Sequence, residues 1–442
     1  MGELAPQEGL SGDVKILETF LDSNPSVEYI RFQWMDYSGL LGARVATKSF
    51  ALSLRRTDSS ITTPSPLLTA MIIDNSLLFE DIEVGQDELF ADWSSLKVCH
   101  YAPKHAMVMC LVKEGGHKEG QGFLRCPRSR LRWACNSAKQ KHDLDFLVGN
   151  EVEFCIFDES SGTPKPIDMV AHTYSAASIN NKYLPIVEEI VECIQNAGIE
   201  VRQFHSEGGP GLFEISTEPM APLQAADALV YCHETIRNIS RKHGLHGTVY
   251  PKPFEKLSGL GSHIHLSMSR LDKHENFLAG LLEYWRPLAA FYMPNYDSNL
   301  RVRPEERIFW SLHNRTATHR KIKDGHWELR GVDGTANPYL ALTAILTAGV
   351  IGLEKEKRLT MKDPKRMVFE GMEDDEATDL GILHKMPTSL KAAIDSLKAA
   401  EELKDALGPE MIDRYVKVKA KEEENFGKLT GSERRELSMS IF

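Results

Sequence analysis

The sequence predicts an α+β protein with a small β-rich N-terminal part and a larger part that mixes strands and helices. Residues 26–36 and 106–113 are rich in β-forming residues and predict strands. Residues 114–122, Glu-Gly-Gly-His-Lys-Glu-Gly-Gln-Gly, form the clearest linker. After this linker, helical and strand patterns follow one another to the end of the chain.

The expected elements of the larger part follow from periodicity and from their end signals. A helix over 185–196 stops at Gly198, and a helix over 222–243 opens on a proline and stops at Gly244. The other expected helices cover 127–140, 274–291, 338–357 and, with one charged side, 389–426, and the expected strands cover 147–157 and 200–204.

Composition excludes several classes of protein. With 442 residues, 42% hydrophobic and 26% charged, the chain has the make-up of a globular protein of one large domain or two. A net charge of −11 argues against a nucleic-acid binder, and no apolar run is long enough for a membrane span. The N-terminus lacks a signal-peptide pattern, and 7 cysteines without a C-x-x-C pair favour a reducing, cytoplasmic location.

Three short segments each place two polar residues on one face of an expected strand. They are Glu151-Val-Glu153, His263-Ile-His265 and Glu328-Leu-Arg330. Because side chains alternate along a strand, Val152, Ile264 and Leu329 should point the other way, into a core. For any one pair, a solvated strand face explains the pattern better than a binding site does.

Two further glutamates extend the set. Glu207 and Glu214 flank Gly-Gly-Pro-Gly, a turn that allows both carboxylates to reach one point. Five carboxylates and one imidazole suit Mg²⁺ or Mn²⁺ better than Zn²⁺, and so many ligands indicate two or three ions. The expected ligands are Glu151, Glu153, Glu207, Glu214, His263 and Glu328.

Arginines concentrate in one stretch of 30 residues. Since arginine binds carboxylates and phosphates bidentately and stays charged, this stretch suggests a polyanionic substrate such as a nucleotide polyphosphate with a carboxylic acid. A basic surface loop is the alternative. The arginines are Arg301, Arg303, Arg307, Arg315, Arg320 and Arg330.

Taken in order, these motifs resemble the glutamine synthetase family over residues 120–360. The resemblance rests on Gly149-Asn-Glu-Val-Glu-Phe154, Glu207 with Gly211-Leu-Phe-Glu214, Lys252-Pro-Phe254, Gly259-Leu-Gly-Ser-His-Ile-His-Leu-Ser267, Asn314-Arg315, Arg320, Glu328-Leu-Arg330, Asp333 and Ala336-Asn-Pro-Tyr339. It implies a β-grasp N-terminal domain over 12–113 and a catalytic domain over 120–442 with a curved antiparallel sheet flanked by helices. It also implies a ring-shaped homo-oligomer with active sites between subunits.

The resemblance implies an ATP-dependent ligase that joins glutamate, or a related acid, to ammonia or another amine through an acyl phosphate, with two or three Mg²⁺ or Mn²⁺ ions. Glu153, Glu207 and Glu214 match ligands of the ion nearer the acid, and the other three expected ligands match those of the ion on ATP. Arg315 and Arg320 match residues on the transferring phosphoryl group. The residues that match the acid-binding set are Gly259, Arg301, Arg315 and Arg330. The residues that match positions near ATP are His265, Ser267 and Arg320.

Departures from the family fall mainly on the amine side. The family's flap carries a catalytic Glu, but here residues 302–314 are shorter and Arg307 stands near that place, with Glu305 and Glu306 beside it. The ammonium-binding Asp has only a poor match, at Asp74. Other departures are Leu212 for Gln, Ser258 for Asn and His326 for an ATP-contacting Arg.

Three functions remain open at this point. The first is amide formation from ammonia. The second, which the departures favour, is γ-glutamyl transfer to a polyamine or other amine. The third is a non-catalytic member with a role in assembly or signalling, against which six retained ion ligands argue.

Overall fold

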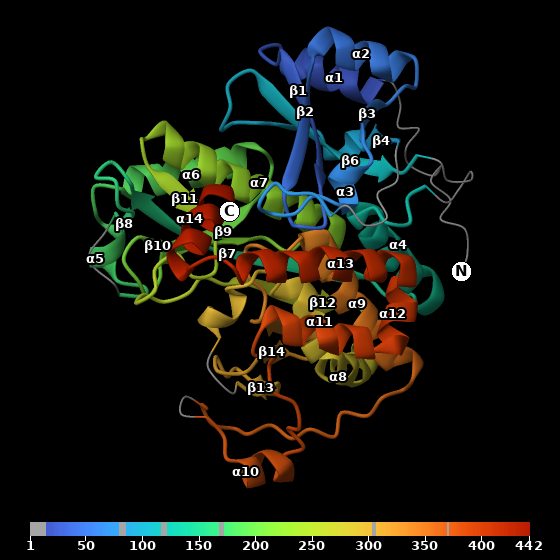
Figure 1. The fold of residues 1–442 in the computed structure, drawn as a ribbon, viewed down its shortest axis with the longest axis vertical. Coiled ribbons are helices and arrows are strands. Elements are labelled where there is room, and N and C mark those ends of the chain that lie inside the picture. The colour runs from blue at the N-terminus through green and yellow to red at the C-terminus, as the bar shows by residue number, and fades with distance from the viewer. Residues whose placement is uncertain (1–14, 79–84, 116–121, 168–171, 303–305, 369–370) are drawn as a thin grey trace.

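The computed structural model describes residues 15–78, 85–115, 122–167, 172–302, 306–368 and 371–442. It contains a small sheet near the N-terminus and a larger sheet packed against helices (Figure 1). This is the α+β fold that the sequence predicts. The linker expected at 114–122 lies mostly outside the described residues, as do residues 12–14 of the expected N-terminal domain.

The small sheet has the strand order β2-β1-β6-β4-β3, with β5 paired to β6. β1 and β6 run parallel and the other pairs are antiparallel. The helices α1 (Lys15–Ser23), α2 (Lys48–Arg56) and α3 (Pro66–Thr69) also belong to this part. The strands are β1 (Tyr29–Met35), β2 (Leu41–Thr47), β3 (Ile61–Pro64), β4 (Gln86–Ala91), β5 (Lys97–Val98) and β6 (His105–Lys113).

The large sheet has the order β13-β14-β15-β12-β7-β10-β9, with β8 and β11 attached to β7. Its pairs are antiparallel as expected, except that β13 and β14 run parallel. The strands are β7 (Phe146–Asp158), β8 (Lys165–Pro166), β9 (Val201–Ser206), β10 (Leu212–Thr217), β11 (His246–Thr248), β12 (Ser262–Met268), β13 (Trp310–Leu312), β14 (His319–Lys323) and β15 (His326–Leu329).

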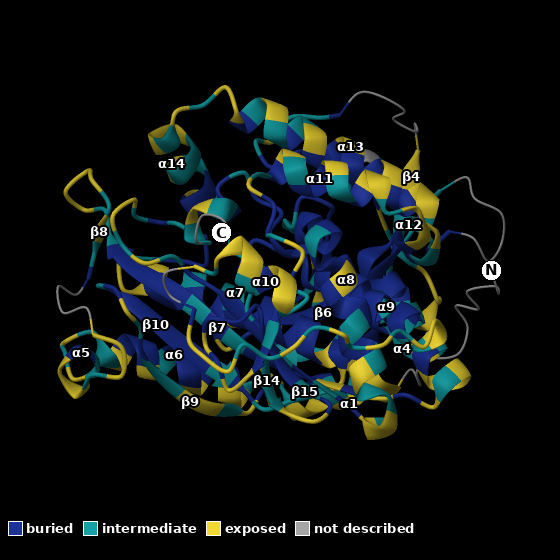
Figure 2. Cartoon of the chain, turned by 90° about the horizontal axis from the view of Figure 1, so that it is seen from below, coloured by how far each residue is buried: buried dark blue, intermediate teal, exposed yellow. Residues whose placement is uncertain are grey.

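Helices cover one face of the large sheet and form most of the buried core (Figure 2). Several begin at a proline, whose fixed φ suits the first helical turn. They are α4 (Pro127–His142), α5 (Ala176–Ile179), α6 (Leu184–Asn196), α7 (Pro222–Lys242), α8 (His274–Tyr292), α9 (Pro338–Glu354), α10 (Asp374–Asp379), α11 (Leu390–Ala399), α12 (Glu401–Leu407), α13 (Pro409–Phe426) and α14 (Gly431–Ile441). No helix among the described residues is long and apolar enough to cross a membrane.

The expected elements agree with the structure apart from their ends. The expected single helical stretch over 389–426 is three helices, α11 to α13, because Ala400 and Gly408 take non-helical backbone angles. Arg330 lies one residue beyond β15 rather than within it. The segment of β9 extends to Ser206, so Glu207 follows the strand directly.

A buried network of ion pairs links the N-terminal sheet to helices of the larger part of the chain. The Arg128 guanidinium on α4 is 2.7 Å from Asp92, which follows β4, and 2.8 Å from Asp227 on α7. The Tyr339 hydroxyl on α9 donates to the same Asp227 carboxylate over 2.7 Å. Since Arg128 is only 3% exposed, its charge depends on these two carboxylates.

Removal of one partner should therefore destabilise the whole protein. Asp227→Ala should lower the unfolding free energy by about 3–5 kcal/mol, because the buried Arg128 guanidinium loses one of the two carboxylates that balance its charge. Denaturant unfolding followed by circular dichroism measures this. Asp395→Ala, which removes an exposed pair with Lys391 on α11, is the control and should leave the midpoint unchanged. Equal midpoints for both variants would contradict the role assigned to Arg128.

Candidate active site

The strand register brings the paired polar residues of β7 and β12 onto one face of the large sheet. Glu151 lies opposite His263, and His265 lies opposite Glu328 on β15. The intervening Val152, Ile264 and Leu329 are at most 4% exposed and belong to the core beneath, as the alternation predicts.

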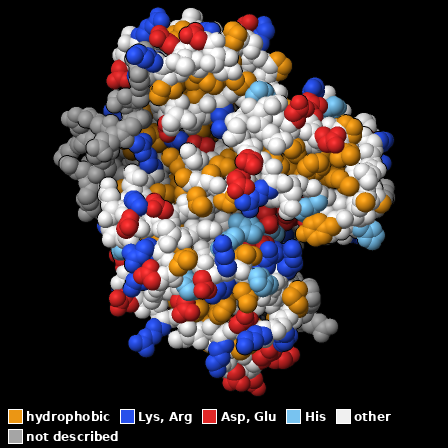
Figure 3. All heavy atoms as spheres, turned by 180° about the vertical axis from the view of Figure 1, so that it is seen from behind, with side chains coloured by type: hydrophobic (Ala, Val, Ile, Leu, Met, Phe, Trp, Pro, Cys, Tyr) orange, Lys and Arg blue, Asp and Glu red, His pale blue; other side chains and the backbone are white. Residues whose placement is uncertain are grey.

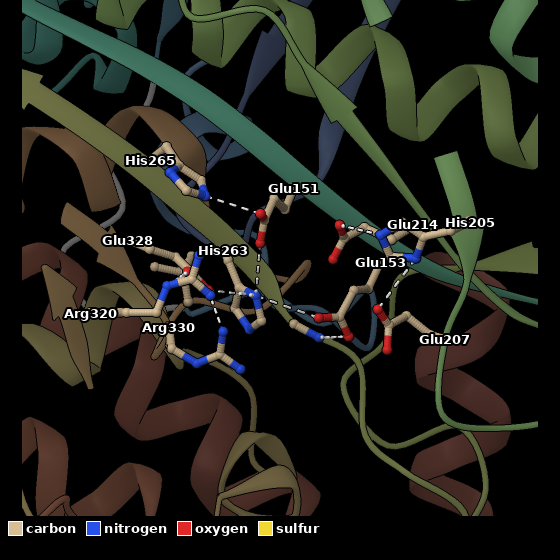
Figure 4. Close-up of polar contacts among 12 residues, drawn as sticks. Glu151, Glu153, His205, Glu207, Glu214, His263, His265, Arg320, Glu328 and Arg330 are labelled. Carbon is tan, nitrogen blue, oxygen red and sulfur yellow. Dashed lines mark hydrogen bonds and ion pairs between the residues drawn. The ribbon is translucent and has the colours of Figure 1, made fainter. Parts of the chain in front are cut away.

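Glu153 and Glu214 lie opposite each other on β7 and β10, and Glu214 also faces His205 on β9. The turn before β10 needs glycine at Gly211, where φ is +67° and an added Cβ would lie 2.5 Å from the Ile156 carbonyl oxygen. This close packing brings Glu207 back beside Glu214 (Figure 4).

A cavity of about 510 Å³ opens over this face. Figure 3 shows acidic, basic and histidine side chains gathered near the middle of one side of the molecule. Glu328 is fully buried and is not among the residues that line the cavity. The other five expected ion ligands line the cavity, namely Glu151, Glu153, Glu207, Glu214 and His263.

Histidines compensate part of the carboxylate charge. Glu151 accepts hydrogen bonds from His263 Nδ1 over 3.2 Å and from His265 Nε2 over 3.0 Å. Burial would raise the pKa of Glu151, but these two histidines outweigh it and hold the pKa below its usual range. Like-charge repulsion alone would predict the opposite direction.

The second half of the cluster shows the effect of repulsion. Burial, with the Glu153 and Glu214 carboxylates, raises the pKa of Glu207 to about 7. Burial, with Glu151 and Glu153, also raises the pKa of Glu214, although a hydrogen bond from His205 opposes the shift. Two neighbouring carboxyls that resist ionisation together are typical of a site that accepts a cation.

Three groups of side chains have ligand atoms within 4.8 Å of one another and are therefore close enough to hold a metal ion. Carboxylate oxygens are ligands of both Mg²⁺ and Mn²⁺, and each group adds one imidazole nitrogen to them. The groups are Glu151, Glu214 and His263; Glu151, His265 and Glu328; and His205, Glu207 and Glu214.

Three arginines add positive charge at one end of the cavity. Arg320 Nε is 2.7 Å from Glu328, and Arg330 forms a second ion pair with the same carboxylate. Arg315 lies close to Tyr174, whose ring meets His205 edge-on at 4.5 Å between centroids. All three guanidinium groups line the cavity, so they are available to an anionic substrate.

Two residues expected to bind the acid lie behind the cavity wall. Arg301 donates to the Arg330 carbonyl over 2.9 Å and to the Val332 carbonyl over 2.7 Å, and it is not among the lining residues. Gly259 packs against it, because an added Cβ would lie 2.4 Å from the Arg301 Cβ. Ser267 lies on β12 opposite His326, two residues beyond His265.

Arg307 does not stand in the cavity, contrary to the hypothesis that it takes the place of the flap Glu. Its guanidinium pairs with Asp374 on α10 and donates to the Met372 carbonyl over 3.3 Å. The Glu306 carbonyl accepts a hydrogen bond from the Met386 amide. This bond ties the segment to the lobe around α10, by which we mean the described residues between 359 and 387. Glu305 lies outside the described residues.

The remaining departures have local explanations. Asp74 accepts hydrogen bonds from Ser76 and from Asn425 on α13, and it does not line the cavity. Leu212 is buried with Cys155 and Leu260, and the Ser258 hydroxyl donates to the Gly208 carbonyl over 3.0 Å.

His326 stands where the family resemblance expects an arginine, and it is a neutral replacement. Its Nε2 is 3.0 Å from His265 Nδ1. Burial, with the positive charge around it, lowers the pKa of His326 to about 4.

His205 and Tyr174 are lining residues that sequence reasoning missed. His205-Ser206-Glu207 repeats the spacing of the other pairs, so the same period-two rule would have found His205. Tyr174 has no such signal, because it reaches the site from a loop that the sequence does not place.

Comparison with known proteins decides the family. The family described as "Glutamine synthetase, catalytic domain" matches residues 124–437, most of the chain. The chain belongs to the glutamine synthetase family. The apo structure of GmaS is similar with a TM-score of 0.77 and 25% identity, over 94% of this chain and 97% of that one.

The relatives to which this chain is similar carry different names. Protein fluG of Emericella nidulans is 33% identical over 95% of this chain, which spans about half (49%) of the length of fluG. A glutamine synthetase of Methanocaldococcus jannaschii is 29% identical over 91% of this chain and 92% of its own. The gamma-glutamylpolyamine synthetase GlnA3 of Streptomyces coelicolor is 26% identical over 80% and 81%.

The electrostatics of the cluster generate a prediction about ion binding. Protons would compete with an ion at Glu207, whose pKa is raised to about 7. They would also compete at His205, where burial lowers the pKa but the hydrogen bond to Glu214 and the charges of Glu214 and Glu207 together raise it. Affinity for Mn²⁺ should therefore fall as the pH drops from about 8 to about 6, by up to about tenfold per unit for each competing proton. Calorimetric titration of the protein alone measures it.

Glu207→Gln is the control for this effect. It should bind Mn²⁺ more weakly at every pH, and with a shallower dependence, because one of the two competing protons is gone. An affinity that does not change across this interval in the unmodified protein would contradict the raised pKa of Glu207.

Proposed function

We propose that this protein is an ATP-dependent carboxylate–amine ligase that forms an amide from glutamate, or a related acid, through an acyl phosphate. The observation that carries the proposal is the face of the large sheet where five carboxylates meet histidines and three arginines. Such a face suits two anionic substrates bound side by side, with cations between them.

The proposed roles follow the charges. Arg315 and Arg320 stabilise the phosphoryl group as it moves from ATP to the acid, since both point into the cavity and stay charged. Arg330 is available to the carboxylate of the acid. Arg301 and Gly259 shape the acid site from behind, and His265 and Ser267 face the nucleotide.

Divalent ions, Mg²⁺ or Mn²⁺, would neutralise the phosphates and the charge that develops on them. We propose two or three per site, held by Glu151, Glu153, Glu207, Glu214, His263 and Glu328. Glu328 is already compensated by Arg320 and Arg330, so it would contribute less net charge to an ion than its neighbours.

The second substrate is proposed to be an amine other than ammonia. Among the described residues that line the cavity, every carboxylate belongs to the ion ligand set. Among the described lining residues, none is therefore left over to hold an ammonium ion and accept its proton, and Asp74 is engaged with α13. The similarity to a gamma-glutamylpolyamine synthetase supports the same choice.

Ammonia is the alternative, supported by the similarity to an archaeal glutamine synthetase. A non-catalytic role is opposed by the carboxylates themselves, because mutually repelling groups on one face destabilise a protein that does not use them. We also propose that the protein works as a ring-shaped homo-oligomer in a reducing, cytoplasmic compartment, where its seven unpaired cysteines would stay reduced.

Phosphate release with ATP and Mg²⁺ or Mn²⁺ tests the function. Glutamate with a diamine or alkylamine should stimulate phosphate release, and mass spectrometry should detect the amide, while ammonia should be a poorer substrate. Release with ammonia that exceeds release with every amine would support the alternative. No release with any acid and amine would support a non-catalytic role.

Arg315→Ala should lower kcat by about 10²–10³-fold, because one preorganised positive group at the phosphoryl position is lost. Arg366→Ala is the matched control, since Arg366 pairs with Glu376 on the surface lobe and should have no effect on kcat. Equal activities of the two variants would remove Arg315 from the proposed mechanism.

Arg307→Glu should not create ammonia-dependent activity, because the new carboxylate would lie beside Asp374 and outside the cavity. It should instead loosen the lobe around α10, seen as faster proteolysis of residues 359–387. Arg307→Lys keeps the charge and should resist proteolysis. A gain of ammonia-dependent activity in Arg307→Glu would show that this side chain reaches the amine.

A further inference from the structure

His205 faces the same ion position as Glu207 and Glu214, although the family resemblance assigns that position to carboxylates alone. We propose that His205 is a ligand of this ion and that it makes the site prefer Mn²⁺ to Mg²⁺. The inference deepens the proposed function, on which it rests, by naming the metal that this site selects.

The position of His205 follows from the sheet. It lies on β9 directly opposite Glu214 on β10, which lies opposite Glu153 on β7, so three side chains form one row across the strands. His205 Nε2 is 3.1 Å from Glu214 Oε1, and its Nδ1 is 3.5 Å from Glu207 Oε1. One imidazole therefore contacts both carboxylates of the ion group.

The ring orientation leaves one nitrogen for a cation. His205 Nδ1 is 3.3 Å from the Ser206 carbonyl oxygen, which can only accept a hydrogen bond, so Nδ1 carries a hydrogen. In the neutral ring, Nε2 then presents its lone pair to the Glu214 carboxylate. Two lone pairs repel at this distance, so a proton or a metal ion must lie between them.

Neighbouring groups hold the ring in this orientation, as the outer partners of metal-binding histidines do. The Tyr174 ring meets the His205 ring edge-on, with an angle of 74° between the planes. The positive charge of Arg315 lies close to Tyr174 in turn. The His205 side chain is 14% exposed, so few rotamers are open to it.

The donor chemistry determines the preferred metal. Mg²⁺ is a hard cation that binds oxygen ligands almost exclusively. Mn²⁺ also binds carboxylates, but as a first-row transition ion it forms a stronger bond to an imidazole nitrogen than Mg²⁺ does. Two carboxylates and one imidazole from His205, Glu207 and Glu214 therefore favour Mn²⁺. A glutamine amide in place of the imidazole would offer an oxygen, which Mg²⁺ accepts as readily.

Titration of the protein with Mn²⁺, following the EPR signal of the free ion, tests the proposal, with Mg²⁺ measured by competition. His205→Gln should weaken Mn²⁺ binding at one site per chain by at least about tenfold, since a change in even an outer partner of a metal ligand typically costs this much. Mg²⁺ affinity should change much less. His142→Gln is the matched control, because His142 also pairs with a glutamate, at 3.1 Å, but lies outside the cavity.

Pulsed EPR of bound Mn²⁺ adds a readout that a structural role would not change. The nitrogen couplings should weaken in His205→Gln and in the shorter His205→Asn, and should persist in His142→Gln. Unchanged couplings, or equal losses of Mn²⁺ and Mg²⁺ affinity, would overturn the assignment. These measurements need neither ATP nor amine, so a protein that fails as a ligase but loses Mn²⁺ preference with His205 would contradict only the proposed function.

Discussion

Electrostatic repulsion among carboxylates on one face of the large sheet is the constraint on which the site depends. Desolvation makes each charge more costly, and neighbours of the same sign add to the cost. The structure compensates in two ways. Histidines bind Glu151 and Glu214, while arginines bind the fully buried Glu328. The two carboxylates of the cavity with raised pKa values, Glu207 and Glu214, share a single histidine, His205, whereas Glu151 has two histidine partners and a lowered pKa.

The scaffold keeps these charges together. Strand pairing holds β9, β10, β7, β12 and β15 side by side, and the apolar side chains beneath them pack on helices. The Arg128 network joins the N-terminal sheet to three of these helices. A charged site of this kind needs a rigid support, since a small separation of the strands would separate ligands from one another.

In the lobe around α10, charged side chains hold chain segments together instead of lining the cavity. Arg307 and Arg366 both form ion pairs with acidic residues of α10, and Phe309 packs with Ala377 in a small separate core. This lobe holds the segment that follows residues 303–305. The arginine near the family's catalytic flap position thus anchors this segment to the lobe instead of entering the cavity.

Much of the candidate site was predictable from local rules. Period-two alternation predicted that Glu151 and Glu153 share one face of their strand, and that His263 and His265 share one face of theirs, because the direction of a side chain in a strand depends only on its position. The same rule applied to His205 would have found a further lining residue. It could not find Tyr174, whose place depends on a loop, or predict that Arg301 binds backbone carbonyls behind the cavity.

The sequence by itself determined the fold class, the family and the faces on which the polar residues lie, because these depend on local periodicity and on motif order. Only the tertiary structure decided which charges meet. Register between strands far apart in the chain sets the distance from His205 to Glu214, and long-range packing turns Arg307 toward Asp374. Such contacts join residues that no local pattern relates, so their pairing is a property of the folded chain.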